Sequence, residues 1–391
     1  MRPALAAAPP ELALLAEASR PKVSPELLLR KAEAVRDWDY FVALAARHGL
    51  ATLAHLRLSK HCPGFVPGGA MDELRAYRRR SAARTLLLQA ELDALLDELA
   101  ARDVPVIPLR GPLMARRLYG DAALRECADL DLLVRREHRG LVADVLRSRG
   151  FVLVAPEGLR GPVPADDEGQ WCFLREDGIY VEPHWELMPR TYPWGLRAEH
   201  VWEGASTANF DGHSVLQPSP EVEFALLCVH SAKHGWEFLS RVTDIAWYLQ
   251  TQPLDGRLMA AVLEGARCKR AVAVTCVLAE ACLGIEPPSW ALDGECRKRA
   301  VALARRVAHS WADASGAEVS LGDWWLRWRI LENPRDKADF LIRALFVPTA
   351  AEVELLRLPR RLWPLYHVFR ACRVLLKYGA RSVRIRRDKH R

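Results

Sequence analysis

The sequence lacks the cysteine patterns that mark disulfide frameworks and zinc ribbons. Its nine cysteines are an odd number, and none of them belongs to a Cys-x-x-Cys pair. This argues against a disulfide scaffold and against a zinc ribbon. Reduced thiols in a cytoplasmic protein account most simply for the cysteines.

Long hydrophobic runs are also missing. The apolar stretch near the N-terminus is interrupted by Glu11 and Glu17, and its uninterrupted part is too short for a signal peptide. The longest later run, residues 271–285, contains Glu280 and is shorter than a membrane span. We therefore expect a soluble cytoplasmic protein without a transmembrane segment.

The body of the chain carries little net charge. The formal net charge is +7, but residues 381–391 contain six basic residues and one aspartate. The remaining body gives weak support for nucleic-acid binding, and nucleic acid is kept only as a weak candidate partner of the basic tail, which is expected to be solvated. The amphipathic, basic segment 355–378 is expected to pack against the helical body, with contact to a membrane surface as the alternative.

Composition and periodicity predict an α+β protein, with a small mixed β-sheet embedded in a mostly helical chain. Half of the 391 residues are hydrophobic and 27% are charged, which is typical of a globular protein with a large core. We divide the chain into an N-terminal helical region (1–100), an α/β core (101–216), a helical lobe bordering the cleft (217–320) and C-terminal helices with a basic tail (321–391).

Apolar runs and turn residues predict the elements of the α/β core. The expected strands are 104–109, 129–134, 151–155, 171–175 and 179–185, the expected helices are 112–119 and 137–149, and residues 156–169 are expected to form a loop. Pro183 within the last strand indicates an edge strand or a bulge, because proline cannot donate to a ladder.

Two aspartates stand two residues apart on the expected strand 129–134. Asp129 and Asp131 therefore project to one face, while Leu130 and Leu132 project into the core. Neighbouring carboxylates repel each other unless a cation lies between them, and Mg²⁺ prefers oxygen ligands. Exposed acidic residues on an edge strand would give the same pattern, so the pair alone is a weak signal.

Two further features of the core favour phosphate chemistry. Gly111 permits close approach of the backbone at a helix N-terminus, and Arg110 adds guanidinium donors, although an ordinary turn with Pro112 would look the same. Glu182 and His184 share a face of the strand 179–185. If this strand pairs near Asp129, then Glu182 completes a carboxylate cluster that could hold metal or accept a proton.

A second cluster of polar residues occurs in the helical lobe. His230, Lys233 and His234 lie on one face of a helix that starts at Ser219 and is expected to run toward Trp247. Asp244 falls near this face if Gly235 does not break the helix. Lys233 could neutralise phosphate, and a zinc site lacks a third local ligand. A helix whose polar residues cap buried carboxylates is the alternative.

Together these motifs resemble the nucleotidyltransferase superfamily with the DNA polymerase β-like fold, and in detail the bacterial family called uncharacterised nucleotidyltransferases. The matching residues are Leu109-Arg110-Gly111, Tyr119, Arg125, Asp129, Asp131-Leu132-Leu133-Val134 and Glu182-Pro183-His184-Trp185, with the region 37–39 and the helix around His230. The sequence departs from the pattern at Arg110, where the family has lysine, and at Pro112, where the superfamily has serine or glycine.

The resemblance implies a Mg²⁺-dependent enzyme that transfers a nucleotide from a nucleoside triphosphate to a hydroxyl or phosphate of an acceptor. It implies that two Mg²⁺ ions are held by the catalytic residues Asp129, Asp131 and Glu182, that Arg110, Gly111, Arg125 and Lys233 bind the nucleotide, and that His184, His230, His234 and Asp244 border the cleft. The acceptor stays open between a small molecule, a peptide, a protein and RNA. A non-catalytic binding protein on the same fold is the alternative function.

Overall fold

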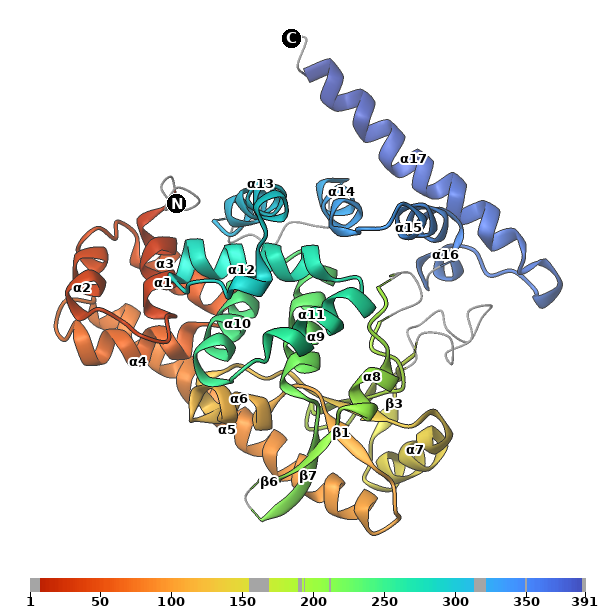
Figure 1. Cartoon of the computed structure of the whole chain (residues 1–391), viewed down its shortest axis with the longest axis horizontal. Helices are drawn as coiled ribbons and strands as arrows, with labels where there is room; N and C mark the ends of the chain where they lie inside the picture. Colours follow the sequence, from red (N-terminus) through yellow and green to blue (C-terminus); the bar gives the residue numbers. More distant parts are fainter. Residues whose placement is uncertain are drawn as a thin grey trace.

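The computed structural model describes residues 8–154, 169–188, 192, 194–210, 212–312, 321–348 and 350–388. Helices make up most of it and surround a small mixed sheet, which confirms the predicted α+β class (Figure 1). The predicted loop at 156–169 lies outside the described residues, apart from Gly169.

Five helices precede the sheet, as the helical periodicity of the first hundred residues predicts. They are α1 (Pro10–Ala18), α2 (Pro25–Glu33), α3 (Trp38–Arg47), α4 (Ala51–His61) and α5 (Gly68–Ala100). Ser24 caps α2 by accepting a hydrogen bond from the backbone N–H of Leu27, with Pro25 in the first turn.

The main sheet has five strands in the order β1-β2-β5-β4-β3. These are β1 (Val106–Pro108), β2 (Asp129–Val134), β3 (Val152–Leu153), β4 (Phe173–Leu174) and β5 (Tyr180–His184), with α6 (Pro112–Tyr119) and α7 (Arg139–Ser148) between them. Strands β2 and β5 run parallel, and the other pairs are antiparallel. The register places Asp131 beside Glu182.

The expectation for Pro183 is wrong, because β5 lies in the middle of the sheet, between β2 and β4. The ladder of β4 reaches only Tyr180 and Val181. Beyond it, the Pro183 carbonyl accepts a hydrogen bond from the Trp171 N–H at 3.0 Å. In a strand, the nitrogen and the carbonyl of one residue point to the same side. The nitrogen of Pro183 therefore points to the side of β4, and at this position β4 has already ended, so no ladder hydrogen bond of β4 is lost.

The two faces of β2 belong to different surroundings. Leu130 and Leu132 are buried, as predicted, in a core shared with the C-terminal half of α5 and with α7. Leu133 faces a larger core in which the N-terminal helices pack together with the later helices. Asp129 and Asp131 lie on the Leu133 face, where these helical parts meet the sheet.

After the sheet, the chain forms α8 (Ala198–Glu203), a hairpin of β6 (Ser206–Phe210) and β7 (His213–Gln217), and then helices. These are α9 (Pro220–Lys233), α10 (Leu239–Thr251), α11 (Gly256–Gly265), α12 (Lys269–Leu283) and α13 (Gly294–Ser310). The expected single helix toward Trp247 is wrong. Gly235 and Trp236 have φ values of 63° and 51°, which end α9 and let α10 start in a new direction.

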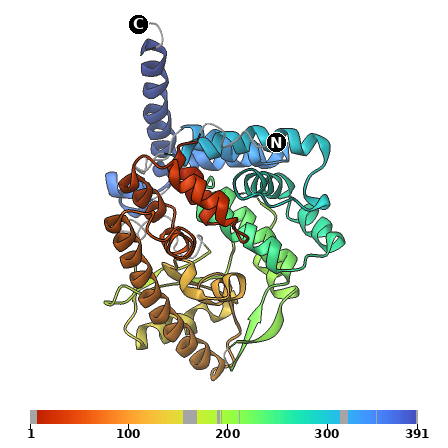
Figure 2. The ribbon, with the colours of Figure 1, turned by 90° about the vertical axis from the view of Figure 1, so that its left-hand side faces the viewer.

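The C-terminal part consists of α14 (Leu321–Ile330), α15 (Pro334–Phe346), α16 (Ala350–Leu355) and α17 (Leu365–Asp388). Helix α17 extends past the body of the molecule in both views (Figures 1 and 2). The expectation that the segment 355–378 packs into the body is wrong for one face of α17, whose leucines are exposed. Within the described residues, no helix has the length and apolar character needed to cross a membrane.

Candidate active site

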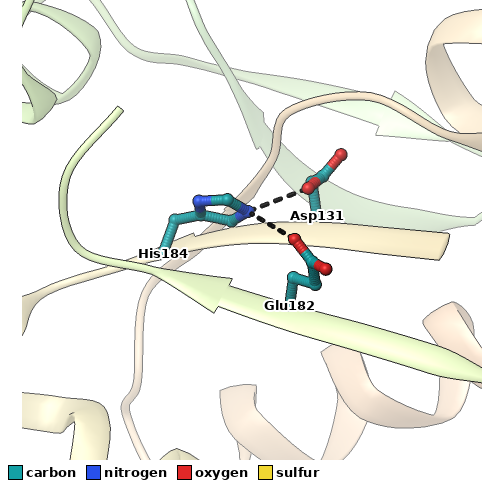
Figure 3. Close-up of side chains that lie close together, drawn as sticks. All are labelled: Asp131, Glu182 and His184. Atoms are coloured by element: carbon teal, nitrogen blue, oxygen red, sulfur yellow. Dashed lines mark hydrogen bonds and ion pairs between the residues drawn. The ribbon is translucent and has the colours of Figure 1, made fainter. Parts of the chain in front are cut away.

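The parallel pairing of β2 and β5 brings three predicted site residues together. Asp131, Glu182 and His184 each offer one ligand atom, and these atoms lie within 4.8 Å of one another. The His184 Nε2–H donates to Asp131 Oδ1 at 2.8 Å and lies 3.7 Å from Glu182 Oε2 (Figure 3). The cluster follows from strand periodicity, because residues two apart on adjacent strands share one face.

Asp131 is the most deeply buried member of this cluster, with 2% of its surface exposed. Arg110 Nη2 lies 2.6 Å from its Oδ2, while His184 binds the other oxygen. Burial raises the pKa of Asp131, but the charge of Arg110 and the hydrogen bond from His184 outweigh it, so the pKa lies below its usual value. Asp131 is therefore ionised, with Arg110 paired to one of its oxygens and His184 hydrogen-bonded to the other.

Asp129 is in a different electrostatic environment. Burial and the neighbouring charge of Asp131 raise its pKa to about 6, with a further contribution from Glu182. Glu182 accepts a hydrogen bond from Gln170 Nε2 at 2.9 Å. Asp129 and Glu182 both line the adjoining cavity, so a cation arriving there would meet two carboxylates that partly repel each other.

The cavity has a volume of about 640 Å³ and is walled by three parts of the chain. The sheet contributes Asp129, Glu182 and His184, and the end of α3 contributes residues 46–49. Helices α9 and α10 contribute the opposite wall, namely Leu227, His230, Ser231, Lys233, His234, Phe238, Ser240, Arg241 and Asp244. The cavity is thus lined by side chains of both charge signs, with Asp129 and Glu182 on the sheet and Lys233 and Arg241 on the helices.

Both ring nitrogens of His230 face guanidinium groups. Arg241 Nη1 lies 2.9 Å from Nδ1, and Arg110 contacts Nε2. Burial and the two arginine charges lower the pKa of His230 well below its usual value, so the ring is neutral. The ring of His234 lies 4.7 Å away, centroid to centroid. A zinc site on this pair is not supported, because neither nitrogen of His230 is free.

Lys233, at the end of α9, lines the cavity with an ammonium group that is not paired with any described residue. Its Nζ makes no hydrogen bond or ion pair with any described residue. Burial and the charge of Arg110 lower its pKa to about 8, against the opposing effect of Asp131 and Glu182. At neutral pH the ammonium group is therefore charged and available to an anion.

Arg125 and Asp244 both line the cavity and form an ion pair with each other. Arg125 Nε lies 3.1 Å from both carboxylate oxygens of Asp244, and the Tyr119 hydroxyl donates to Asp244 Oδ1 at 2.7 Å. The three groups connect α6, the segment before β2 and helix α10. This geometry fits a positioning role for both charged residues.

Gly111 acts through its backbone and does not itself line the cavity. Its φ of 100° turns the chain from β1 into α6, with Pro112 as the first helical residue. A side chain is disfavoured at this positive φ. The turn brings the preceding residue, Arg110, against Asp131.

Sequence reasoning missed several residues of the cavity. Arg241 stands three residues before Asp244 on α10, a spacing that puts both on one helix face and could have indicated a shared environment. Gln170 follows the undescribed loop and gives no signal of its own. The end of α3, around Gly49, looks in sequence like any helix end, because only tertiary packing carries it to the cavity.

The donor atoms fit a divalent cation of the Mg²⁺ type. Asp131 and Glu182 supply carboxylate oxygens close to one another, while Asp129 lies outside this close group and lines the adjoining cavity. The raised pKa of Asp129 reflects burial together with negative charge that a cation would relieve. The Arg110 guanidinium occupies one oxygen of Asp131 and would have to share it.

Comparison with known proteins agrees with this geometry. A family model described as "Uncharacterised nucleotidyltransferase" matches residues 34–284, which include the candidate site residues of the sheet and of α9 and α10. Neither a curated protein nor a solved structure was found to match the chain.

Proposed function

The chain belongs to the family of uncharacterised nucleotidyltransferases, and from this we propose that it transfers a nucleotide from a nucleoside triphosphate to an acceptor. The observation that carries the proposal is the register of β2 and β5, which sets Asp131 beside Glu182, next to a cavity that Lys233 and Arg241 also line. We place the activity in the cytoplasm, where free cysteines stay reduced.

Asp129, Asp131 and Glu182 would hold two Mg²⁺ ions, with His184 orienting Asp131 through its hydrogen bond. When bound, such ions neutralise phosphate charge and polarise the attacked phosphorus. Asp129 and Glu182 line a cavity large enough for a nucleotide, which supports this assignment.

Lys233 and Arg241 would bind the triphosphate. Lys233 offers an uncommitted ammonium group, and Arg241 lies beside it on the next helix. An acceptor hydroxyl would attack the α-phosphorus, a new oxygen–phosphorus bond would form, and pyrophosphate would leave. Glu182 stands at the cavity surface and would take the proton of the hydroxyl. Arg110 would keep Asp131 ionised throughout.

The test uses Asp129→Asn and Asp131→Asn in the full chain. Labelled triphosphates are supplied one at a time with Mg²⁺ and a cell extract as acceptor source, and label transfer and pyrophosphate are measured. We expect each variant to lose about a hundredfold or more of the turnover while its circular dichroism is unchanged. Asp144→Asn, on the exposed face of α7, is the matched control and should retain full turnover. Unchanged turnover in both site variants would refute the proposal.

A non-catalytic binding protein is the second candidate. The Gly111–Pro112 turn motivates it, since Pro112 removes an N–H that could bind phosphate. Calorimetry with Mg²⁺ and each nucleoside triphosphate separates the two functions. If none of them binds, the accessory function is favoured over nucleotide transfer.

A further inference from the structure

Exposed hydrophobic side chains are concentrated near the end of the chain. Of the nineteen large hydrophobic residues that are exposed in the described part of the chain, ten lie between residues 341 and 376. They are Leu341, Ile342, Phe346, Leu355, Leu356, Leu362, Leu365, Val368, Leu375 and Leu376. Scattered exposed leucines need no explanation, but a concentration of this kind marks an interaction surface.

Helix α17 is anchored to the neighbouring helices α15 and α16 by its inner face. Arg370 Nη1 lies 3.0 Å from the buried carboxylate of Glu352, and its Nε donates to the Ala344 carbonyl at 3.2 Å. Arg373 also contacts Glu352, and the buried Tyr366 hydroxyl contacts the backbone of Leu356. These contacts orient the helix, so its outer face is presented in a defined direction.

The outer face of α17 is an apolar stripe. Leu365, Val368, Leu375 and Leu376 are 49%, 60%, 63% and 73% exposed, and the exposed Cys372 lies between them. Their spacing of three and four residues places them along one side of the helix. About half or more of the surface of each of these side chains is left in contact with water, so its burial against a partner would be favourable.

Helix α15 extends the apolar surface beside α17. Its inner residues Phe340 and Ala344 are buried, whereas Leu341, Ile342 and Phe346 are 46%, 58% and 47% exposed. The two helices meet where His367 Nδ1 lies 2.7 Å from the Phe346 carbonyl. The exposed apolar surface therefore spans two adjoining helices.

Helix α17 and the residues that follow it carry mostly positive charge. From residue 365 to residue 387 the sequence contains no Asp or Glu, and residues 377–391 contain seven Lys or Arg and a single Asp. An apolar stripe on a helix that continues into a cationic end is the pattern of a helix lying in a membrane interface. We propose that α17, with the outer face of α15, binds the surface of a membrane that contains anionic lipid.

Charge complementarity favours an anionic membrane over a second copy of the chain or a nucleic acid as the partner of this surface. A second copy of the chain would bring more positive charge to the same region, whereas anionic lipid brings the opposite sign. Nucleic acid would satisfy the cationic end but would leave the leucines in water. The lipid interface satisfies both parts, and it does not require a helix that spans the bilayer.

The experiment is sedimentation of the full chain with two kinds of vesicle, phosphatidylcholine alone and phosphatidylcholine mixed with phosphatidylglycerol. We expect binding to the mixed vesicles, weaker binding at high salt, and little binding to phosphatidylcholine alone. The double variant Leu375→Glu/Leu376→Glu should bind the mixed vesicles about tenfold or more weakly, because it places two charges in the apolar stripe.

The matched control is Leu86→Glu/Leu87→Glu on α5, where two adjacent leucines are 71% and 54% exposed. It should bind vesicles like the unchanged protein, and all three proteins should have the same circular dichroism and melting temperature. Absence of binding to the mixed vesicles would overturn the proposal. So would equal binding by both double variants, or self-association in light scattering that only Leu375→Glu/Leu376→Glu abolishes.

Discussion

At the scale of single residues, Lys233 differs from three arginines that line the same cavity. Arg110 is paired with Asp131, Arg125 with Asp244, and Arg241 with Glu237 at 3.3 Å. The Nζ of Lys233 has no partner among the described residues, and its pKa of about 8 leaves it charged at neutral pH. A partly buried charge without a partner is costly, and an anionic ligand, as we propose for the triphosphate, would offset that cost.

The substitution Lys233→Met tests this role. It keeps the length of the side chain and removes the charge, so we expect the KM for the nucleoside triphosphate to rise by about ten- to a hundredfold. Lys233→Arg should restore part of the affinity, because it restores the charge. Steady-state kinetics or calorimetry provides the measurement, and Lys60→Met on the exposed end of α4 is the control. A KM that does not change in Lys233→Met would contradict the assignment.

At the scale of elements, a buried ion pair between Arg125 and Asp244 connects the segment before strand β2 with helix α10. Arg125 precedes β2, and Asp244 lies on α10 with 5% of its surface exposed. A buried pair is strongly destabilised when one partner is removed, because the other charge is left uncompensated. We therefore expect Arg125 and Asp244 to act on the site by positioning β2 against α10.

We expect Asp244→Asn to lower the free energy of unfolding by about 3–5 kcal/mol. In Arg125→Met/Asp244→Asn the orphaned charge is gone, and the amide still accepts from the Tyr119 hydroxyl. The double variant should therefore be more stable than the single one, as measured by urea denaturation. Losses that simply add would show that the two residues do not act as a pair.

His48 connects three helices at the scale of the whole molecule. Its Nε2–H donates to the Trp311 carbonyl at 2.9 Å, and its Nδ1 accepts from the Leu239 N–H at 3.1 Å. These bonds connect the end of α3 with the start of α10 and the end of α13. Because Nδ1 accepts, the ring must be neutral, and burial lowers its pKa from 6.5 to about 4.

Stability should therefore depend on pH in a defined direction. Between pH 6.5 and 4 the unfolded chain binds a proton at His48 that the folded chain does not bind. The free energy of unfolding should thus fall as the pH falls through this window, by on the order of 3 kcal/mol from this residue. His48→Gln should show a correspondingly smaller loss in denaturation curves at pH 7 and pH 4. Equal losses in both proteins would exclude His48 as the source.

Local elements were predictable from the sequence where one residue pattern decided them. The alternation of Asp129 to Val134 predicted β2, and Pro112 with the following residues predicted α6. The β6–β7 hairpin was missed although Asp211-Gly212 is a hairpin signal. The break after α9 depended on the positive φ at Gly235 and Trp236, and tryptophan rarely adopts this conformation.

The sequence by itself determined which side chains could carry the chemistry, because strand and helix periods assign neighbouring residues to shared faces. It thereby predicted that Asp129 and Asp131 share a face and that His230 and Lys233 belong together. Only the tertiary structure decided that β5 pairs in parallel with β2, that His184 binds Asp131, and that the end of α3 reaches the cavity. These contacts join residues separated by dozens of positions, and such pairings depend on packing of the whole chain rather than on any local pattern.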